Sequence, residues 1–226
     1  MIKKTIIILA LAGLIFMILP ILTNFQPAEK LNYLAKEYVE GSTQTLQSAN
    51  IVTSVIVTYR GLDTLGEVTV LFLATIGVGF LLKKSKYKTT PRTVSENLKT
   101  TSSFLVALIM ILGIYIFTHG HLSPGGGFQG GVVIASGFLL LMLSDLSFKV
   151  NHTILMLVES ISGFTYVLLG LLGVILSIGF LNAQILPLGR LGNLFSAGAI
   201  PIIYSLIGLK VGSELTNIVI TMGGEK

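Results

Sequence analysis

The sequence contains no cysteine and no tryptophan, and it has few charged residues. Without cysteine, the chain holds no disulfide, thiolate nucleophile, iron–sulfur cluster or cysteine-ligated zinc. Any redox chemistry must therefore reside in another protein. Without tryptophan, anchoring at a membrane surface falls to tyrosine and to cations. Charged residues make up 11% of the 226 positions, against about 25% in a typical soluble domain.

Hydrophobic residues make up 52% of the chain, and the mean hydropathy is +0.86. So few charges cannot solvate a folded surface, which excludes a secreted enzyme, a nucleic-acid binder and a disordered tail. The net charge of +5 does not indicate a nucleic-acid partner. Six of the fifteen cations lie between Lys83 and Lys99, which is typical of a membrane-topology signal.

Six apolar stretches are long enough to cross, or nearly cross, a bilayer. The alternating pattern of barrel strands is absent, so helices must satisfy the backbone. We therefore expect an all-α polytopic membrane protein with about six transmembrane helices. The first stretch follows two lysines, as in a signal peptide, but its length and the absence of an obvious cleavage site favour a retained helix. The stretches are Thr5–Leu22, Leu65–Leu82, Ser102–Thr118, Phe128–Leu146, Thr153–Phe180 and Ala199–Thr221.

The distribution of cations predicts the orientation of these spans. Lysines precede the first span, six cations lie between the second and third spans, and Lys149 lies between the fourth and fifth. The positive-inside rule makes this side cytoplasmic and places both termini there. The polar stretch Lys83–Ser103 is the predicted linker. It divides the chain into a two-span part, residues 1–98, and a four-span part, residues 99–226.

Three charged residues lie around the start of the second span, three and four residues apart: Arg60, Asp63 and Glu67. If this stretch is helical they form a small charged cluster, and all three are candidates for an ion or proton path. A single helix over Asn50–Leu82 would be too long for one crossing, so we expect a break near Gly61. Thr64 and Glu67 then match a capping box that opens the span. The carboxylate of Glu67 serves either as this cap or as part of an ion or proton path, and the two roles are compatible.

A glycine-rich loop joins the third and fourth spans. It has no lysine followed by serine or threonine and no preceding strand, which argues against nucleotide binding. Two histidines without a nearby carboxylate or cysteine are a weak metal signal. We expect a rigid loop that docks on a partner subunit, with an imidazole able to gate protons. The residues in question are His119, His121, Pro124, Gly125, Gly126, Gly127 and Phe128.

Three ionisable residues lie inside the last two spans. Glu159 is about two turns into the fifth span, and Lys210 and Glu214 lie in the sixth, four residues apart and so on one helix face. A charge at such depth costs several kcal/mol unless it is paired or hydrated. These residues indicate an ion or proton path, or alternatively a contact that docks another subunit.

The segment HGHLSPGGGFQGG, residues 119–131, resembles the signature of the MnhB/MrpB family, which supplies the B subunit of multi-subunit Na⁺/H⁺ antiporters. The segments NLFSAGAIPI, residues 193–202, and GLKVGSEL, residues 208–215, are similar to the C-terminal half of that family. The stretch NIVTSVIVTYRGLDTLGE, residues 50–67, resembles instead the C-terminal region of the large A subunit of these antiporters. Membrane-bound hydrogenases carry that region as a small separate protein.

The resemblance implies a non-redox membrane subunit without its own catalytic centre or cofactor. It would contribute to a Na⁺ or H⁺ path and to assembly, in a hydrogenase-like or related respiratory complex of a prokaryotic cytoplasmic membrane. The implied partners are lipid, membrane proteins resembling the A, C and D subunits of the antiporters, and hydrogenase or sulfur-reductase subunits. A purely structural adaptor and a component of a stand-alone Mrp-type antiporter are the alternatives.

Overall fold

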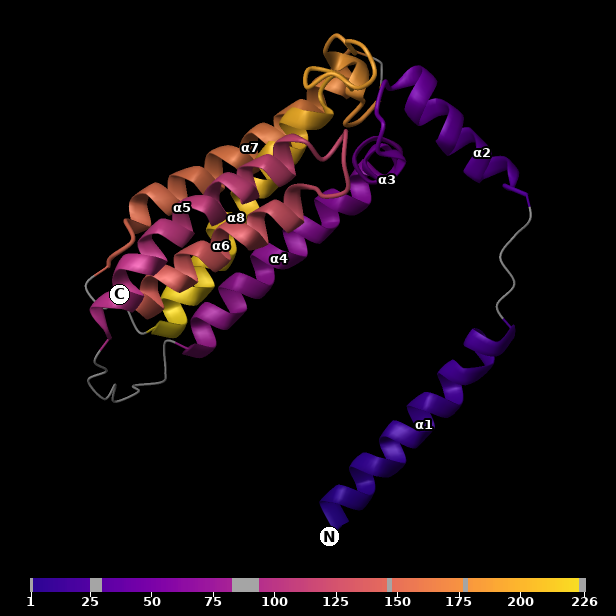
Figure 1. The fold of residues 1–226 in the computed structure, drawn as a ribbon. Coiled ribbons are helices and arrows are strands. Elements are labelled where there is room, and N and C mark those ends of the chain that lie inside the picture. Colours follow the sequence, from indigo (N-terminus) through magenta and orange to yellow (C-terminus); the bar gives the residue numbers. More distant parts are fainter. Residues whose placement is uncertain (1, 25–29, 83–93, 146–147, 177–178, 224–226) are drawn as a thin grey trace. The chain divides into compact units, whose positions relative to one another are not determined.

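The computed structural model describes residues 2–24, 30–82, 94–145, 148–176 and 179–223. All regular structure within these ranges is helical, as the sequence predicted (Figure 1). The chain divides into two compact units, residues 1–36 and 37–226. Six of the described helices are long and apolar enough to cross a membrane. Five of the cations that predict the orientation lie outside the described residues, so the orientation stays a prediction: Lys83, Lys84, Lys86, Lys88 and Arg92.

The first unit consists mainly of helix α1, Ile2–Asn24. Its side chains from Lys3 to Thr23 are all exposed, and Pro20 lies inside the helix. Proline is tolerated within membrane helices. An apolar helix that is exposed on all sides within its own unit needs an apolar environment around it. A short helix follows, α2, Tyr33–Glu40, which spans the boundary between the two units.

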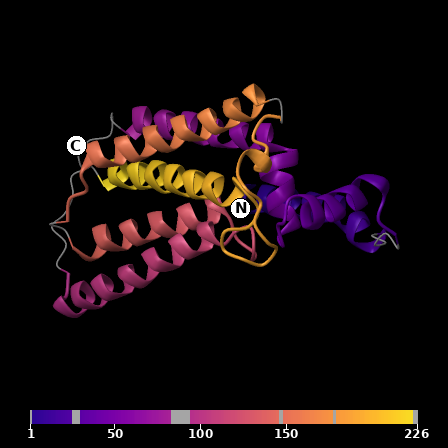
Figure 2. The same cartoon turned by 90° about the horizontal axis from the view of Figure 1, so that it is seen from above.

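The second unit is a bundle built around one central helix. Figure 2 shows α8 between the α4 and α7 side and the α5 and α6 side, and α8 packs against all four of them. Its position explains why α8 has the most buried residues of the spans. The five helices are α4 Gly61–Leu82, α5 Glu96–Thr118, α6 Gly127–Ser144, α7 His152–Ile175 and α8 Ile200–Gly223.

Polar caps set several helix starts. Ser95 caps α5 by accepting the backbone N–H of Leu98 at 3.3 Å. Asn151 caps α7 by accepting the N–H of Thr153 at 2.9 Å. Each side chain satisfies an amide that the first helical turn leaves without a partner. These caps define the starts of α5 and α7, whereas Gly126 before α6 forms no side-chain cap.

The chain breaks before α4, as predicted, but one turn earlier than the expected cap. The segment before the break is α3, Ile51–Ser54, continued by the π-helical turn Val55–Tyr59. Helix α4 then begins at Gly61. The predicted capping box is wrong, because the Thr64 hydroxyl lies inside the helix and donates to the carbonyl of Ile56 at 2.8 Å.

The fifth span is shorter than the sequence suggested. Helix α7 ends at Ile175 rather than at Phe180. The following described segment, 179–199, is a compact loop with one 3₁₀ turn, Ala183–Ile185. Buried Leu181 and Ala197 adopt positive φ angles of 55° and 62°. Such backbone angles do not occur in a right-handed helix, so the apolar composition of this loop does not indicate a continuing span. Some of its apolar side chains are buried and others are exposed, with Phe195 at 87%.

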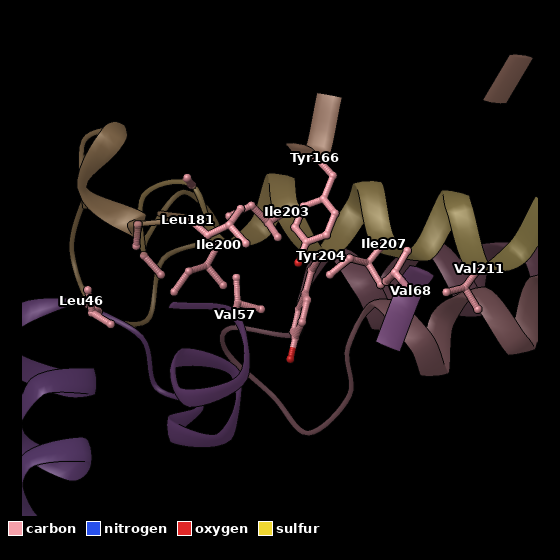
Figure 3. Packing of buried hydrophobic residues seen from close by; sticks show 13 residues of the cluster. Leu46, Val57, Val68, Tyr166, Leu181, Ile200, Ile203, Tyr204, Ile207 and Val211 are labelled. Carbon is pink, nitrogen blue, oxygen red and sulfur yellow. The ribbon is translucent and has the colours of Figure 1, made fainter. Parts of the chain in front are cut away.

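The hydrophobic core of the second unit follows the N-terminal half of α8. Figure 3 shows Ile200, Ile203, Ile207 and Val211 in a row, with Tyr166 of α7 beside them. The side chain of Val57 from the turn before α4 also joins this cluster. All six residues are at most 2% exposed. The core therefore ties the residues around α4 to the last two spans.

Candidate functional site

Three ionisable residues from α7 and α8 meet inside the bundle. The Nζ atom of Lys210 lies 2.6 Å from Oε1 of Glu214, so the predicted shared helix face is confirmed. The same Nζ lies 4.0 Å from Oε1 of Glu159 on α7. Sequence spacing could not show this second contact, because it depends on how the two helices pack. We call Glu159, Lys210 and Glu214 the charged triad.

The triad is largely shielded within the chain. The side chain of Glu214 is fully buried, whereas those of Lys210 and Glu159 are 13% and 15% exposed. Apart from the ion pair, neither carboxylate oxygen of Glu214 has a hydrogen-bond partner among the described residues. A buried carboxylate with one partner is energetically demanding. An ionisable residue at this depth is by default a candidate for a functional group.

Two uncharged residues complete the surroundings of the ammonium group. The ring of Phe72 on α4 has its centroid 4.8 Å from Nζ of Lys210, within the range of a cation–π interaction. Gly163 on α7 lies against the same side chain, where an added Cβ would approach Cδ of Lys210 to 3.4 Å. The glycine and the lysine side chain are therefore direct neighbours between the two helices. Sequence analysis assigned neither residue to this site, since both belong to ordinary apolar helix patterns.

The triad has two carboxylates and one ammonium group. With all three ionised, its formal charge is −1 inside the membrane-spanning part of the chain. Such a group can hold one additional proton, or it can place a cation beside the carboxylates. Because Lys210 contacts both acids, a small movement of its flexible side chain changes which carboxylate is neutralised. The arrangement is therefore suited to exchanging a cation.

Arg60, Asp63 and Glu67 form no comparable cluster. Nη2 of Arg60 lies 2.6 Å from Oδ2 of Asp63, but both side chains are more than half exposed. Glu67, also exposed, has no ion pair among the described residues. The sequence predicted that these three residues are neighbours on a helix. The structure joins two of them and leaves the third on the outer face of α4.

The glycine-rich loop is hydrogen-bonded to the segment before α3. The side-chain amide of Asn50 donates to the carbonyls of Gly120 and Ser123 at 2.8 and 3.0 Å. The hydroxyl of Thr53 donates to the Gly120 carbonyl at 2.6 Å, and the backbone N–H of Asn50 donates to the carbonyl of His121 at 3.0 Å. This side of the loop is therefore occupied by the chain's own N-terminal part.

His121 lies at the centre of this contact and is fully buried. Its two ring nitrogens have no hydrogen-bond partner among the described residues. Burial lowers the pKa of the imidazole. The nearby backbone of Asn193 and Leu194 acts in the opposite direction and raises the pKa, although it forms no hydrogen bond with the ring. The neutral form is favoured as a result. His119, in contrast, is only half-buried and stacks on Tyr115 with a centroid distance of 4.1 Å.

The rest of the loop fixes the start of α6. Gly125 has a φ of 147°, which side chains rarely adopt. At Gly127 an added Cβ would approach Cβ of Ile207 to 2.7 Å, so only glycine allows this approach to α8. Phe128 packs against the hydrophobic core, whereas Pro124 is exposed. Within the described residues, no group of three or more metal-ligating side chains is present.

The loop contact also shows which residues sequence analysis missed. Ser48, Asn50 and Thr53 supply the donors, and none of them was singled out. Asn50 precedes a short helix, where its side chain accepts the N–H of Thr53 at 3.3 Å. An asparagine at that position indicates a helix cap. Nothing in the sequence, however, connects it to carbonyls about seventy residues later.

Helices long and apolar enough to span a bilayer, with three ionisable side chains in contact among them, define a multi-pass membrane protein. Comparison with protein families adds the specific relationship. Residues 97–217 match the domain related to the MnhB subunit of Na⁺/H⁺ antiporters, and the chain belongs to this family. Residues 3–100 match a second family, MbhE, described as the E subunit of MBH.

Solved structures and curated relatives agree with this assignment. A chain of the membrane-bound sulfane sulfur reductase, an archaeal respiratory membrane complex, is 41% identical, with 98% of each chain covered and a TM-score of 0.82. A chain of the Mrp complex from a Dietzia species shares the fold at 23% identity and a TM-score of 0.77, covering 99% of this chain and 26% of that one. A probable A/B subunit of a K⁺/H⁺ antiporter from Rhizobium meliloti is 27% identical, covering 58% of this chain and 15% of the relative.

Proposed function

We propose that the chain is a non-redox membrane subunit of an Mrp-type Na⁺/H⁺ antiporter module within a respiratory complex of a prokaryotic cytoplasmic membrane. Its likeness to a chain of the sulfane sulfur reductase over nearly the full length supports a complex of that kind. Its partners are membrane proteins resembling the A, C and D subunits of the antiporters, together with redox subunits of the hydrogenase or sulfur-reductase type. The chain itself supplies no redox centre.

The chain combines two parts in this proposal. Residues 1–98 correspond to the C-terminal region of the antiporters' large A subunit, and residues 99–226 correspond to their B subunit. The separate family matches over residues 3–100 and 97–217 support the division. The likeness to a relative named as an A/B subunit supports the same pairing. The hydrogen bonds between Asn50 and the glycine-rich loop would then join the two parts.

The observation that carries the transport role is the charged triad. Glu159, Lys210 and Glu214 lie within membrane-spanning helices, and one ammonium group faces two carboxylates. In the proposed role, the triad takes up and releases one proton or Na⁺ per cycle, while Lys210 shifts between Glu214 and Glu159. A transported cation replaces the ammonium beside one carboxylate, so the two acids are never both left without a counter-charge.

Replacing Glu159 by glutamine in the intact complex tests this role. We expect sodium-dependent proton transport into vesicles to fall at least tenfold in Glu159→Gln, because one acceptor of the ammonium is lost, while all subunits still copurify. Glu96→Gln is the matched control, since Glu96 lies at the exposed start of α5. Full transport activity in Glu159→Gln, with the complex assembled, would contradict the proposed path.

A purely structural adaptor is the second candidate, and the glycine-rich loop favours it. An added Cβ at Gly126 would approach Oε1 of Gln129 to 2.9 Å and Cζ of Tyr204 to 3.1 Å. Under this alternative, Gly126→Val releases partner subunits, whereas Glu159→Gln leaves transport nearly normal. Purification also distinguishes a stand-alone antiporter from a respiratory complex, because only the latter yields redox subunits together with this chain.

A further inference from the structure

Helix α4 carries an exposed stripe that no other described residue of the second unit covers. Its members recur with the spacing 4-3-4-3-4, which is the spacing of a seam between two packed helices. We call this stripe the carboxylate seam. It consists of Asp63, Glu67, Val70, Ala74, Gly77 and Leu81, which lie on one outward-facing side of the helix.

The opposite face of α4 already has its partner. Thr64, Val68 and Thr75 are buried, and the helix packs there on α8. On the carboxylate seam, Val70 is 65% exposed and Leu81 is 77% exposed. An added Cβ at Gly77 would meet no atom within 4 Å. The seam is therefore a second face of α4 that is suited to helix packing, in addition to the face that packs on α8.

A neighbouring stripe of α4 has the same spacing but a different composition. It carries no charge and presents mainly large apolar side chains, which suit contact with lipid. Its exposed members are Leu62, Gly66, Thr69, Leu73, Ile76 and Phe80. The neighbouring stripe is therefore suited to contact with lipid. The carboxylate seam, which carries two acidic side chains, is not.

Two features of the carboxylate seam point to a protein helix. Glu67 lies six residues after the start of α4, about 9 Å along its axis. A charge exposed to hydrocarbon is costly, and this one has no ion pair within the described chain. Further along, Ala74 and Gly77 are small enough for another backbone to approach closely. The nearby Asp63, by contrast, already pairs with Arg60.

We propose that the carboxylate seam binds one transmembrane helix of a neighbouring protein in the complex, and that this helix presents a lysine or arginine to Glu67. The partner helix has apolar residues along the remaining 21 Å or so from Glu67 to Leu81. The inference rests on the proposed function in one respect, namely that the chain works within a membrane complex. It assigns Glu67 to the recognition of a partner rather than to an ion or proton path.

The test uses the complete complex, purified from its native membrane through a tag on this chain. Ala74→Phe adds bulk to the carboxylate seam, and Thr69→Phe adds similar bulk to the lipid-facing stripe of the same helix. We expect Ala74→Phe and Glu67→Lys to lower at least tenfold the recovery of one membrane partner, with Thr69→Phe matching the natural chain. Equal recovery of that partner in Ala74→Phe and Thr69→Phe, whether high or low, overturns the assignment.

Photo-crosslinking supplies a second readout that does not depend on loss of the complex. Benzoylphenylalanine in place of Val70 should form an adduct with the same partner that Ala74→Phe loses, whereas in place of Leu73 it should form adducts with lipid. Lipid adducts at both positions overturn the inference. If the natural chain copurifies with no other membrane protein, the proposed function fails. If every variant retains all the partners, only the seam assignment fails.

Discussion

The ion pair between Lys210 and Glu214 provides a quantitative test of how the last span holds charge. Replacing Lys210 by methionine removes the ammonium but keeps an unbranched side chain of similar length. Glu214 is fully buried and would lose its counter-charge. Removing one partner of a buried pair costs about 3–5 kcal/mol, because the other charge is left uncompensated. This loss lowers the ratio of folded to unfolded protein by about 10²- to 10⁴-fold.

A double-mutant cycle separates this effect from changes in packing. Glu214→Gln in the Lys210→Met background removes the uncompensated charge, so we expect the double variant to recover all but about 1–2 kcal/mol of the loss. Stability would be measured by SDS titration of the purified complex. Lys99→Met is the control, because its pair with Asp145 at 2.9 Å involves a lysine that is 55% exposed. That pair should contribute no more than about 1 kcal/mol. Additive effects of the two triad substitutions would refute the reasoning.

The remaining predictions concern the loop and its packing against the bundle. Asn50→Ala should destabilise the docked loop by about 2–3 kcal/mol, because it removes one helix cap and the two hydrogen bonds to Gly120 and Ser123. Faster hydrogen exchange of the backbone amides of residues 119–123 would measure this loss. Gly131→Ala should lower the thermal stability of the complex, because the new Cβ would lie 2.8 Å from the carbonyl oxygen of Gly208. The lowered pKa of His121 predicts that loop protection persists at neutral pH and weakens as the pH falls below about 6.5, since only the undocked imidazole gains a proton there. If the amide exchange rate of the loop, corrected for its intrinsic pH dependence, is constant between pH 5 and 7.5, His121 does not control loop protection. His121→Phe should abolish the pH dependence of that protection.

Composition and periodicity were sufficient to predict the helical class and the existence of the six spans. These features depend on local hydrophobicity and on the backbone's need for internal hydrogen bonds. The contact between Lys210 and Glu214 was equally predictable from the sequence, because residues four positions apart lie on one face of a helix. The end of α7 was not, because apolar residues also occur in the described loop after it, outside any helix of a span. Apolar composition alone does not distinguish these two environments.

The approach of Glu159 to Lys210 and the hydrogen bonds from Asn50 to the loop required the tertiary arrangement. The first depends on the contact between α7 and α8. The second joins residues about seventy positions apart through backbone carbonyls, and a carbonyl has the same chemistry in every residue. A sequence pattern therefore identifies the possible donors but gives no sign of their acceptors.

The hydrogen bonds between the segment 48–53 and the loop 119–123 have a consequence for affinity. Because donors and acceptors belong to one chain, their meeting is an intramolecular event, whose effective concentration is set by the intervening chain with helices α4 and α5. Contacts that would associate two separate proteins only weakly can then remain formed nearly all the time. If the two segments were carried by separate polypeptides, the same donors would need support from additional buried surface. The covalent link thus allows a mainly polar contact to hold the glycine-rich loop in place.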